Sequence, residues 1–207
     1  MVLIGAGFLG TEAVATARDL GCNVTLTDPQ SSPMPDLGLL IGGRLTYLHR
    51  EKGVVLRFNV KPVRFGSVGR RVTQVRLDIG EVVPARVVVV AIGSTPAMEW
   101  LSNSDLTLEK SVSCDARLRA SQDDFAIGDI RNWYHQDLQK HLRVEHRMNA
   151  AEQDISVAQN ILRGEATITP TPFFWTDQHE LQSQSIRHLP MRRDGEGRRG
   201  RILCACS

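Results

Sequence analysis

The chain has 207 residues, of which 42% are hydrophobic and 23% charged, and its formal net charge is +2. These values are ordinary for a globular protein of one or two domains. Six arginines lie in residues 186–207, where a nucleic-acid-binding arm is the alternative to a divergent end. The remaining body is slightly acidic, which argues against a basic nucleic-acid-binding patch there. No apolar run has the length of a transmembrane helix. The sequence therefore predicts a cytoplasmic protein that binds neither nucleic acid nor a membrane.

The number and spacing of the cysteines argue against further classes of protein. The four cysteines are scattered along the chain and include no C-x-x-C pair. This pattern argues against a disulfide framework, a zinc ribbon and a redox-active dithiol. We predict no metal site.

The stretch LIGAGFLGTE near the start of the chain is typical of a nucleotide-binding turn. An apolar strand over 1–5 precedes it, and a helix over 9–20 follows it. Gly5, Gly7 and Gly10 have the spacing G-x-G-x-x-G, in which the first glycine permits a tight turn. The second lets the backbone approach a pyrophosphate, and the third lets the helix pack on the strand. The N–H groups at the helix start would bind the phosphates.

A second strand over 23–28 ends in Asp28, at the distance from the glycines where an acid binds the adenosine ribose hydroxyls. The alternative is an exposed strand-end aspartate that opens the turn Asp28-Pro29. An NADP site usually has an arginine close by for the 2′-phosphate, and the next arginine here is Arg44. The sequence therefore favours NADH over NADPH.

The order of the following elements predicts the fold class. A helix over 37–52 and a strand in GVVLRFN come first, and residues 61–85 alternate as an antiparallel meander. The continuous apolar run in RVVVVAIGSTP predicts a central buried strand, closed by Gly93 and Pro96. We therefore predict an α/β fold with a three-layer, Rossmann-like nucleotide-binding domain.

Beyond this domain the sequence changes character. DDFAIGDI contains a short apolar stretch that ends in Gly128 and Asp129, and PFFWTDQHELQSQ holds an aromatic cluster. Between them a helix is predicted to bury one apolar face. The residues of that face are Met148, Ala151, Ile155, Ala158, Ile161 and Leu162.

Four stretches together resemble the FAD-dependent pyridine nucleotide oxidoreductases, of the ferredoxin, rubredoxin and putidaredoxin reductase type. They are VLIGAGFLGTE, VVVVAIGSTPAMEWL, DDFAIGDI, and VEHRMNAAEQ with FFWTDQHELQSQ. The resemblance implies NAD(H) and FAD as cofactors and a ferredoxin- or rubredoxin-like protein as the electron acceptor. It also implies four segments: an NAD(H)-binding domain over 1–104, part of a second FAD-binding segment over 105–170, the start of a C-terminal interface domain over 171–185, and a divergent arginine-rich tail over 186–207.

The resemblance also assigns candidate binding residues. Gly128 and Asp129 would contact the ribityl and pyrophosphate region of the flavin, and Val144, Glu145 and His146 would lie near it. Trp175 would lie near the isoalloxazine or at the docking face for the acceptor, and Glu12 near the nicotinamide. The nucleotide-binding set comprises Gly5, Gly7, Phe8, Leu9, Gly10, Glu12, Asp28 and Gly93.

Structural roles are the alternatives for several of these residues. Glu12 could only favour the helix dipole, His146 could be a structural histidine, and Trp175 could pack in an interface. We predict no catalytic residue, because hydride transfer between two cofactors needs no acid or base from the protein.

In the resembled family, a flavin-binding segment with its own glycine motif precedes the NAD domain, and a C-terminal domain follows it. On that comparison we expect an incomplete flavin site, a colourless chain and an exposed apolar patch at Phe173, Phe174 and Trp175. The open alternatives are an NAD(H)-binding fragment without activity and a relative of the disulfide reductases. The sequence leaves the oligomeric state undecided.

Overall fold

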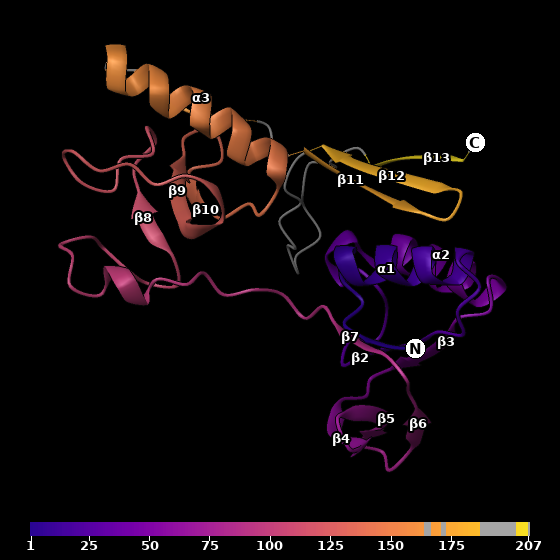
Figure 1. The fold of residues 1–207 in the computed structure, drawn as a ribbon. Helices are drawn as coiled ribbons and strands as arrows, with labels where there is room; N and C mark the ends of the chain where they lie inside the picture. The colour runs from indigo at the N-terminus through magenta and orange to yellow at the C-terminus, as the bar shows by residue number, and fades with distance from the viewer. Residues whose placement is uncertain (164–166, 171–172, 187–201, 207) are drawn as a thin grey trace. The chain divides into compact units, whose positions relative to one another are not determined.

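The computed structural model describes residues 1–163, 167–170, 173–186 and 202–206 (Figure 1). The chain divides into unit 1, Met1–Gly93 with Trp175–Ser207, and unit 2, Ser94–Phe174. This division falls before residue 104, where the NAD(H)-binding domain is predicted to end, and it joins the segment from Trp175 to the first unit. In the part of the chain that the structure describes, each helix is too short or too polar to cross a bilayer.

Unit 1 contains a parallel sheet with the strand order β3-β2-β1-β7. The strands are β1 (Val2–Ile4), β2 (Thr25–Asp28), β3 (Val55–Phe58) and β7 (Val88–Val90). Helices α1 (Phe8–Asp19) and α2 (Leu39–Glu51) cover one face, and the other carries the meander of β4 (Pro62–Val68), β5 (Arg71–Leu77) and β6 (Val82–Pro84) (Figure 1). The short helix η1 (Pro35–Leu37) precedes α2. The predicted α/β, Rossmann-like fold class is confirmed.

Strand β1 contributes to a hydrophobic core on each face of the sheet, because its side chains alternate between the two faces. Val2 and Ile4 are buried in the cluster with Val75 of the meander. Leu3 is buried in the cluster with Val14 of α1. A strand that is buried on both faces has a continuous run of apolar residues, and MVLI at the start of the chain is such a run.

The prediction of a central strand in RVVVVAIGSTP is wrong. Strand β7 lies at the edge of the four-stranded sheet and pairs with β1 alone among the described strands. Val90 at its end is 56% exposed. An apolar run indicates that a strand contacts a core, but it does not determine the order of strands in a sheet.

Unit 2 is a smaller mixed structure around the buried ring of Trp133. Its sheet has the order β10-β9-β8, in which β8 and β9 are parallel and β9 and β10 antiparallel. The elements are η2 (Glu99–Leu101), β8 (Val112–Cys114), η3 (Gly128–Ile130), β9 (Arg131–His135), β10 (Lys140–Leu142) and α3 (Arg147–Arg163). The Trp133 indole N–H donates to the Ile168 carbonyl oxygen at 3.2 Å, which satisfies the polar group of the buried ring.

The predicted buried face of α3 is also wrong. Met148, Ile155 and Leu162 are 47%, 62% and 81% exposed, and Ile161 and the two alanines of that face are exposed as well. The buried positions are Gln153, Val157 and Asn160. Gln153 is drawn inward by polar partners inside unit 2, and the Asn160 amide donates to the Arg117 carbonyl oxygen at 3.2 Å. Periodicity locates a stripe of apolar residues but does not show what the stripe contacts.

The C-terminal strands are β11 (Phe173–Gln178), β12 (Leu181–Ile186) and β13 (Ile202–Cys206), in that order in a three-stranded sheet. Strands β12 and β13 are antiparallel, from Leu181 opposite Cys206 to Ser185 opposite Ile202. The predicted divergent tail thus contributes a strand, while residues 187–201 lie outside the described residues. Of the predicted aromatic patch, Trp175 is 42% exposed, and the side chains of Phe173 and Phe174 lie outside the described set.

Candidate functional site

The glycine turn joins β1 to α1, and each glycine has its own steric reason. Gly5 has φ +107°, a conformation that L side chains rarely adopt, and its N–H donates to the Thr27 carbonyl oxygen at 2.9 Å. A Cβ at Gly10 would overlap the Gly5 carbonyl oxygen and lie 3.1 Å from Leu3 Cδ2. A Cβ at Gly7 would have no atom within 4 Å. Gly5 and Gly10 therefore close the turn, and Gly7 leaves open space over it.

Asp28 is connected directly to this turn. Its Oδ2 accepts a hydrogen bond from the Ala6 N–H at 2.6 Å, and its Oδ1 accepts one from the Gln30 N–H at 2.7 Å. The residue is 9% exposed, so the strand-end acid is not a solvated side chain. A carboxylate has about four acceptor positions, and two bonds leave capacity for ribose hydroxyls. The contact with Ala6 could not be seen in the sequence, because Ala6 contributes only its backbone.

We expect Asp28→Ala to weaken NADH binding by about 1–3 kcal/mol, because a buried acceptor for the ribose and for the Ala6 N–H is lost. The wild-type chain should bind NADH more tightly than NADPH, since no arginine or lysine follows Asp28 in the sequence before Arg44 to bind the 2′-phosphate. Calorimetric titration of both nucleotides measures this. Equal or tighter binding of NADPH by the wild-type chain would refute the preference.

Phe8, Leu9 and Gly93 lie around the turn in different environments. Phe8 is partly buried against the cluster of Met34 and Leu45 from the region of α2. Leu9 is largely exposed at the start of α1. Gly93 has φ +94°, and a Cβ built there would contact nothing within 4 Å. Their roles in nucleotide binding remain predictions.

Glu12 lies on α1 one turn beyond the start of the helix, and its Oε1 accepts a hydrogen bond from the Thr176 hydroxyl at 2.6 Å. Thr176 belongs to β11, next to Trp175, which points to the opposite side of the strand and is half exposed. Two residues singled out from the sequence, Glu12 and Trp175, are thus brought to the same region of unit 1. Thr176 is the residue that connects them, and no pattern in the sequence indicates it.

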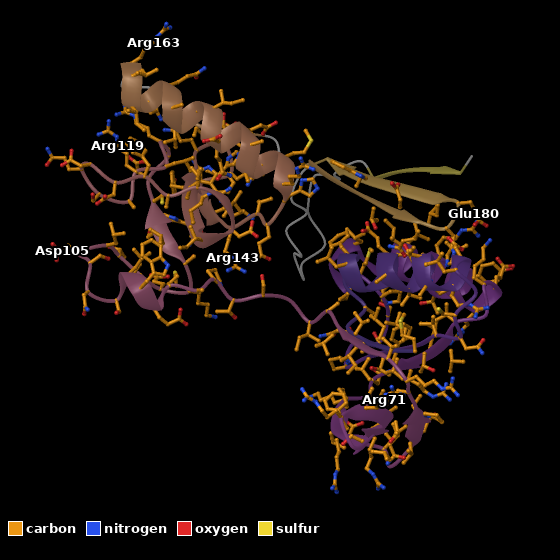
Figure 2. The ribbon with its side chains drawn as sticks, in the orientation of Figure 1. Arg71, Asp105, Arg119, Arg143, Arg163 and Glu180 are labelled. Atoms are coloured by element: carbon orange, nitrogen blue, oxygen red, sulfur yellow. The ribbon has the colours of Figure 1, made fainter. Side chains whose placement is uncertain are left out.

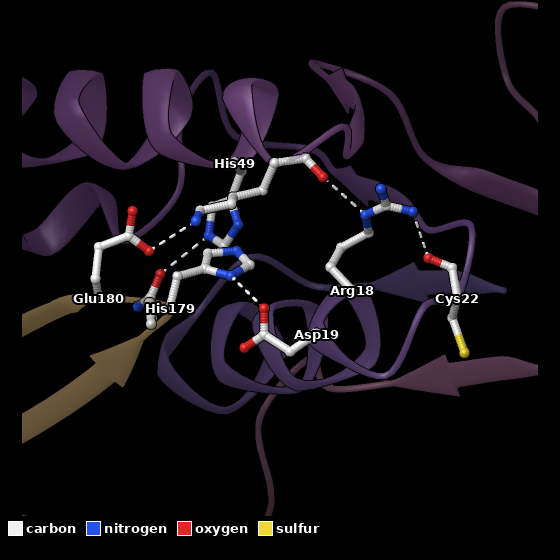
Figure 3. A network of polar contacts seen from close by, with 8 residues as sticks. Arg18, Asp19, Cys22, His49, His179 and Glu180 are labelled. Atoms are coloured by element: carbon white, nitrogen blue, oxygen red, sulfur yellow. Dashed lines mark hydrogen bonds and ion pairs between the residues drawn. The ribbon is translucent and has the colours of Figure 1, made fainter.

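The same strand anchors to α2 through buried polar contacts (Figure 3). Gln178 lies 3.0 Å from His49 Nε2 through its Oε1, and its amide nitrogen donates to Thr176 Oγ1 at 3.2 Å. In the turn that follows, the His179 ring contacts the Asp19 carboxylate at 3.0 Å, and Glu180 pairs with Lys52 at 2.9 Å. The rings of His49 and His179 lie edge to face, with centroids 5.4 Å apart. These polar contacts supplement the packing of Leu181, which is buried in the cluster with Ile41, Leu45 and Leu48 of α2.

His49 makes this anchorage sensitive to pH. Burial is the main reason that its pKa is lowered to about 4, and the neighbouring His179 lowers it further, although the bond to Gln178 acts in the opposite direction. The neutral ring is therefore favoured in the folded chain, where Nδ1 is buried without a hydrogen-bond partner among the described groups. Its contribution to stability is complete above the unfolded-state pKa of about 6.5 and is lost as the pH falls through 4.

We expect the free energy of unfolding to drop by about 3 kcal/mol from this group between pH 7 and pH 4. His49→Gln should remove that part of the pH dependence, and replacement of the exposed His141 by glutamine should not. Urea unfolding at a series of pH values measures both. The same slope in wild type and His49→Gln would contradict the assignment.

In unit 2 the Gly128–Asp129 turn is fixed by a hydrogen bond between its backbone and the Gln153 side chain. The Gln153 Oε1 accepts from the Gly128 N–H at 3.0 Å and from Arg131 Nε at 2.7 Å. Gly128 has φ +72°, and the Asp129 side chain is exposed at the turn. Gln153 thus fixes the backbone that presents Asp129. The motif NAAEQ contains it, but the sequence interpretation assigned it no role.

Arg131 is a fully buried cation stacked on the Trp133 ring, with its guanidinium carbon 3.6 Å from the centroid. Burial lowers its pKa to about 9, while Cys114 and Asp129 act in the opposite direction. Its Nη1 donates to the Leu142 carbonyl oxygen at 3.2 Å. Its Nη2 and the Gln153 amide nitrogen are buried without a partner among the described atoms. This cluster is the polar centre of unit 2.

The predicted Val144–His146 segment follows β10 and leads into α3. Glu145 forms an ion pair with Arg143 (labelled in Figure 2) and accepts a hydrogen bond from the Ser94 hydroxyl at 3.1 Å. Val144 packs partly buried against the core around Trp133, and the Met148 N–H lies 3.4 Å from His146 Nδ1. A cavity of about 720 Å³ lies beside this segment, lined by Ser94, Thr95, Pro96, Met98, Glu109, Lys110, Ser111, Asn132 and Arg143.

The predicted site residues therefore form two groups, one in each unit. The glycine turn, Glu12, Asp28, Gly93 and Trp175 belong to unit 1, and Gly128, Asp129 and the Val144–His146 segment belong to unit 2. A parallel sheet whose first strand leads through such a turn into a helix, with a buried acid at the end of the next strand, defines a dinucleotide-binding α/β protein.

The chain belongs to the pyridine nucleotide-disulphide oxidoreductase family, whose sequence model matches residues 1–153. It is 31% identical to the ferredoxin–NAD(+) reductase component of the anthranilate 1,2-dioxygenase system of Burkholderia cepacia, covering 90% of this chain and 46% of that protein. It is 30% identical to rhodocoxin reductase of Rhodococcus erythropolis, covering 89% and 44%. The chain thus spans about half the length of the curated relatives it matches.

Solved structures agree with this assignment. The ferredoxin reductase for the CYP199A2 system from Rhodopseudomonas palustris is similar with a TM-score of 0.85 at 29% identity, covering 89% of this chain and 46% of that one. The covalent putidaredoxin reductase–putidaredoxin complex is similar with a TM-score of 0.81 at 29% identity, covering 89% and 45%. The family resemblance stated from the four motifs is confirmed.

Proposed function

We propose that this chain takes part in electron transfer from NADH through FAD to an iron–sulfur protein of the ferredoxin or rubredoxin kind. The observation that carries the proposal is the bond between Asp28 and the Ala6 N–H, which joins the acid of β2 and the glycine turn in one site. The family membership of the chain and the names of its relatives support the same proposal of electron transfer.

The start of α1 fits the pyrophosphate of a dinucleotide. The helix has no side-chain cap at its N-terminus and no acidic residue in its first turn. No acidic side chain of the first turn therefore competes with a phosphate for the N–H groups there, which favours phosphate binding. The open space over Gly7 gives that phosphate access to the backbone. In this proposal Gly5, Gly7 and Gly10 form the turn and Asp28 binds the ribose.

The residues of unit 2 fit the sugar side of a flavin in part. The exposed Asp129 carboxylate is an acceptor for ribityl hydroxyls, and Gln153 holds its turn in place. Glu145 and His146 offer polar groups at the start of α3. When bound, the flavin supplies the conversion of a two-electron hydride donor into single electrons, and the protein supplies binding and orientation.

The partner and the location are part of the same proposal. Trp175 offers a half-exposed ring for the flavin side or for the acceptor. The buried Cys114 and the exposed Cys22 are free thiols, which supports a reducing, cytoplasmic environment.

The test is a flavin titration of the purified chain followed by anaerobic addition of NADH. Because unit 2 offers only part of a flavin site, we expect the purified chain to be colourless, to bind FAD weakly when it is added in excess, and to lower the absorbance of that FAD when NADH follows. A matched Asp129→Asn variant should bind the added FAD more weakly. A chain that binds NADH but neither binds nor reduces the added FAD would contradict the electron-transfer function and favour the alternative of an NAD(H)-binding chain without activity.

A further inference from the structure

A continuous chain of hydrogen bonds runs from Glu12 on α1 to His49 on α2 by way of strand β11. The Thr176 hydroxyl lies 2.6 Å from Glu12 Oε1, the Gln178 amide nitrogen 3.2 Å from Thr176 Oγ1, and Gln178 Oε1 3.0 Å from His49 Nε2. Thr176, Gln178 and His49 are fully buried. The two β11 residues lie on one side of the strand, as its alternation requires.

Each hydrogen bond in this series can have only one direction from donor to acceptor. An ionised Glu12 can only accept, so the Thr176 hydroxyl donates to it. The Thr176 oxygen then accepts from the Gln178 NH₂ group, which also lies 3.8 Å from the Met34 sulfur. The Gln178 carbonyl oxygen therefore faces His49, whose Nε2 must carry the proton. His49, at the other end of this series of hydrogen bonds, thus helps to fix the position of the Glu12 carboxylate.

Glu12 lies close to the proposed nucleotide site. Helix α1 begins at Phe8 directly after the glycine turn, and Glu12 stands one helical turn further along, about 6 Å along the axis. Asp28 and the turn account for the ADP half of a dinucleotide. A carboxylate one helical turn into α1 is within reach of the nicotinamide half of the dinucleotide, which extends beyond the pyrophosphate.

We propose that Thr176 is a positioning residue that holds the Glu12 carboxylate for the nicotinamide half of the dinucleotide, with Gln178 and His49 holding Thr176 in turn. The inference rests on the proposed function, because it takes NADH as the ligand of the glycine turn. Without the hydroxyl, Glu12 loses the bond that fixes its rotamer. The ADP half, bound elsewhere, is unaffected.

The test compares NADH with ADP-ribose, which lacks the nicotinamide, by calorimetric titration of the full chain. Thr176→Val should weaken NADH about tenfold, because the Glu12 carboxylate is no longer held in place before the nicotinamide half binds, and leave ADP-ribose within about twofold. Thr176→Ser, which keeps the hydroxyl, should restore NADH binding. Thr46→Val is the matched control, because Thr46 loses only a bond to the Gly42 carbonyl oxygen within α2.

Each result is decisive. Selective loss of NADH affinity with rescue by serine supports the proposal. Equal weakening of NADH and ADP-ribose would show a merely structural role and overturn it, as would wild-type affinity in Thr176→Val. A wild-type chain that binds neither ligand would overturn the proposed function itself, and the inference with it.

Discussion

Alanine in place of Gly10 is expected to destabilise unit 1 by about 3 kcal/mol, although alanine is the better helix former. The new Cβ would overlap the Gly5 carbonyl oxygen, a backbone atom fixed by the tight turn, and would press on Leu3 Cδ2 at 3.1 Å. Neither group can move away without opening the contact between α1 and β1. Because Gly5 begins the nucleotide turn, the same change should abolish NADH binding.

Gly43→Ala provides the matched control. Gly43 is an exposed residue of α2, and a Cβ built there has no atom within 4 Å. The substitution should raise the free energy of unfolding by up to about 1 kcal/mol. Urea unfolding followed by circular dichroism compares the two variants. If Gly10→Ala were as stable as the wild type, the close packing of helix and strand would not be a requirement of this turn.

Gln153→Met should lower the free energy of unfolding by about 3 kcal/mol, through a different mechanism in unit 2. The methionine keeps the shape of the side chain but removes the acceptor shared by Arg131 Nε and the Gly128 N–H. Arg131 is fully buried and would lose its closest polar partner. The Gly128–Asp129 turn would also lose its support.

Gln159→Met on the exposed side of the same helix is the control, since it changes the same atoms in contact with solvent. The buried Trp133 ring, stacked on Arg131, reports unfolding by fluorescence. A change of less than about 0.5 kcal/mol in Gln153→Met, similar to the control, would mean that water or a neighbouring group replaces the lost acceptor.

The sequence predicted the first half of the fold because its signals there are local. The glycine spacing, the acid that ends β2 and the alternation of the meander each depend on residues close in the chain. The edge position of β7 depends on which strands the rest of the chain supplies beside it. The buried face of α3 depends on Arg131 and the Gly128 turn, which attract Gln153 inward against the apolar pattern.

The contacts that complete the candidate site lie beyond the reach of sequence patterns. Ala6 meets Asp28 through a backbone N–H, which leaves no mark on residue type. Thr176 and Glu12 are separated by 164 positions, and a single threonine in a strand carries no signal of its partner. The sequence identified Glu12 as a candidate by resemblance, and only the structure shows what holds it.

The most direct test of the account is a calorimetric titration of NADH into the wild-type chain and into Gly7→Ala. A Cβ at Gly7 meets no protein atom, and its φ of −75° is open to any residue, so stability should change by less than about 1 kcal/mol. The new methyl group would occupy the space proposed for the pyrophosphate. We predict one NADH per wild-type chain and at least about tenfold weaker binding in the variant. Unchanged affinity in Gly7→Ala, with the wild type binding NADH, would contradict the placement of the dinucleotide on this turn.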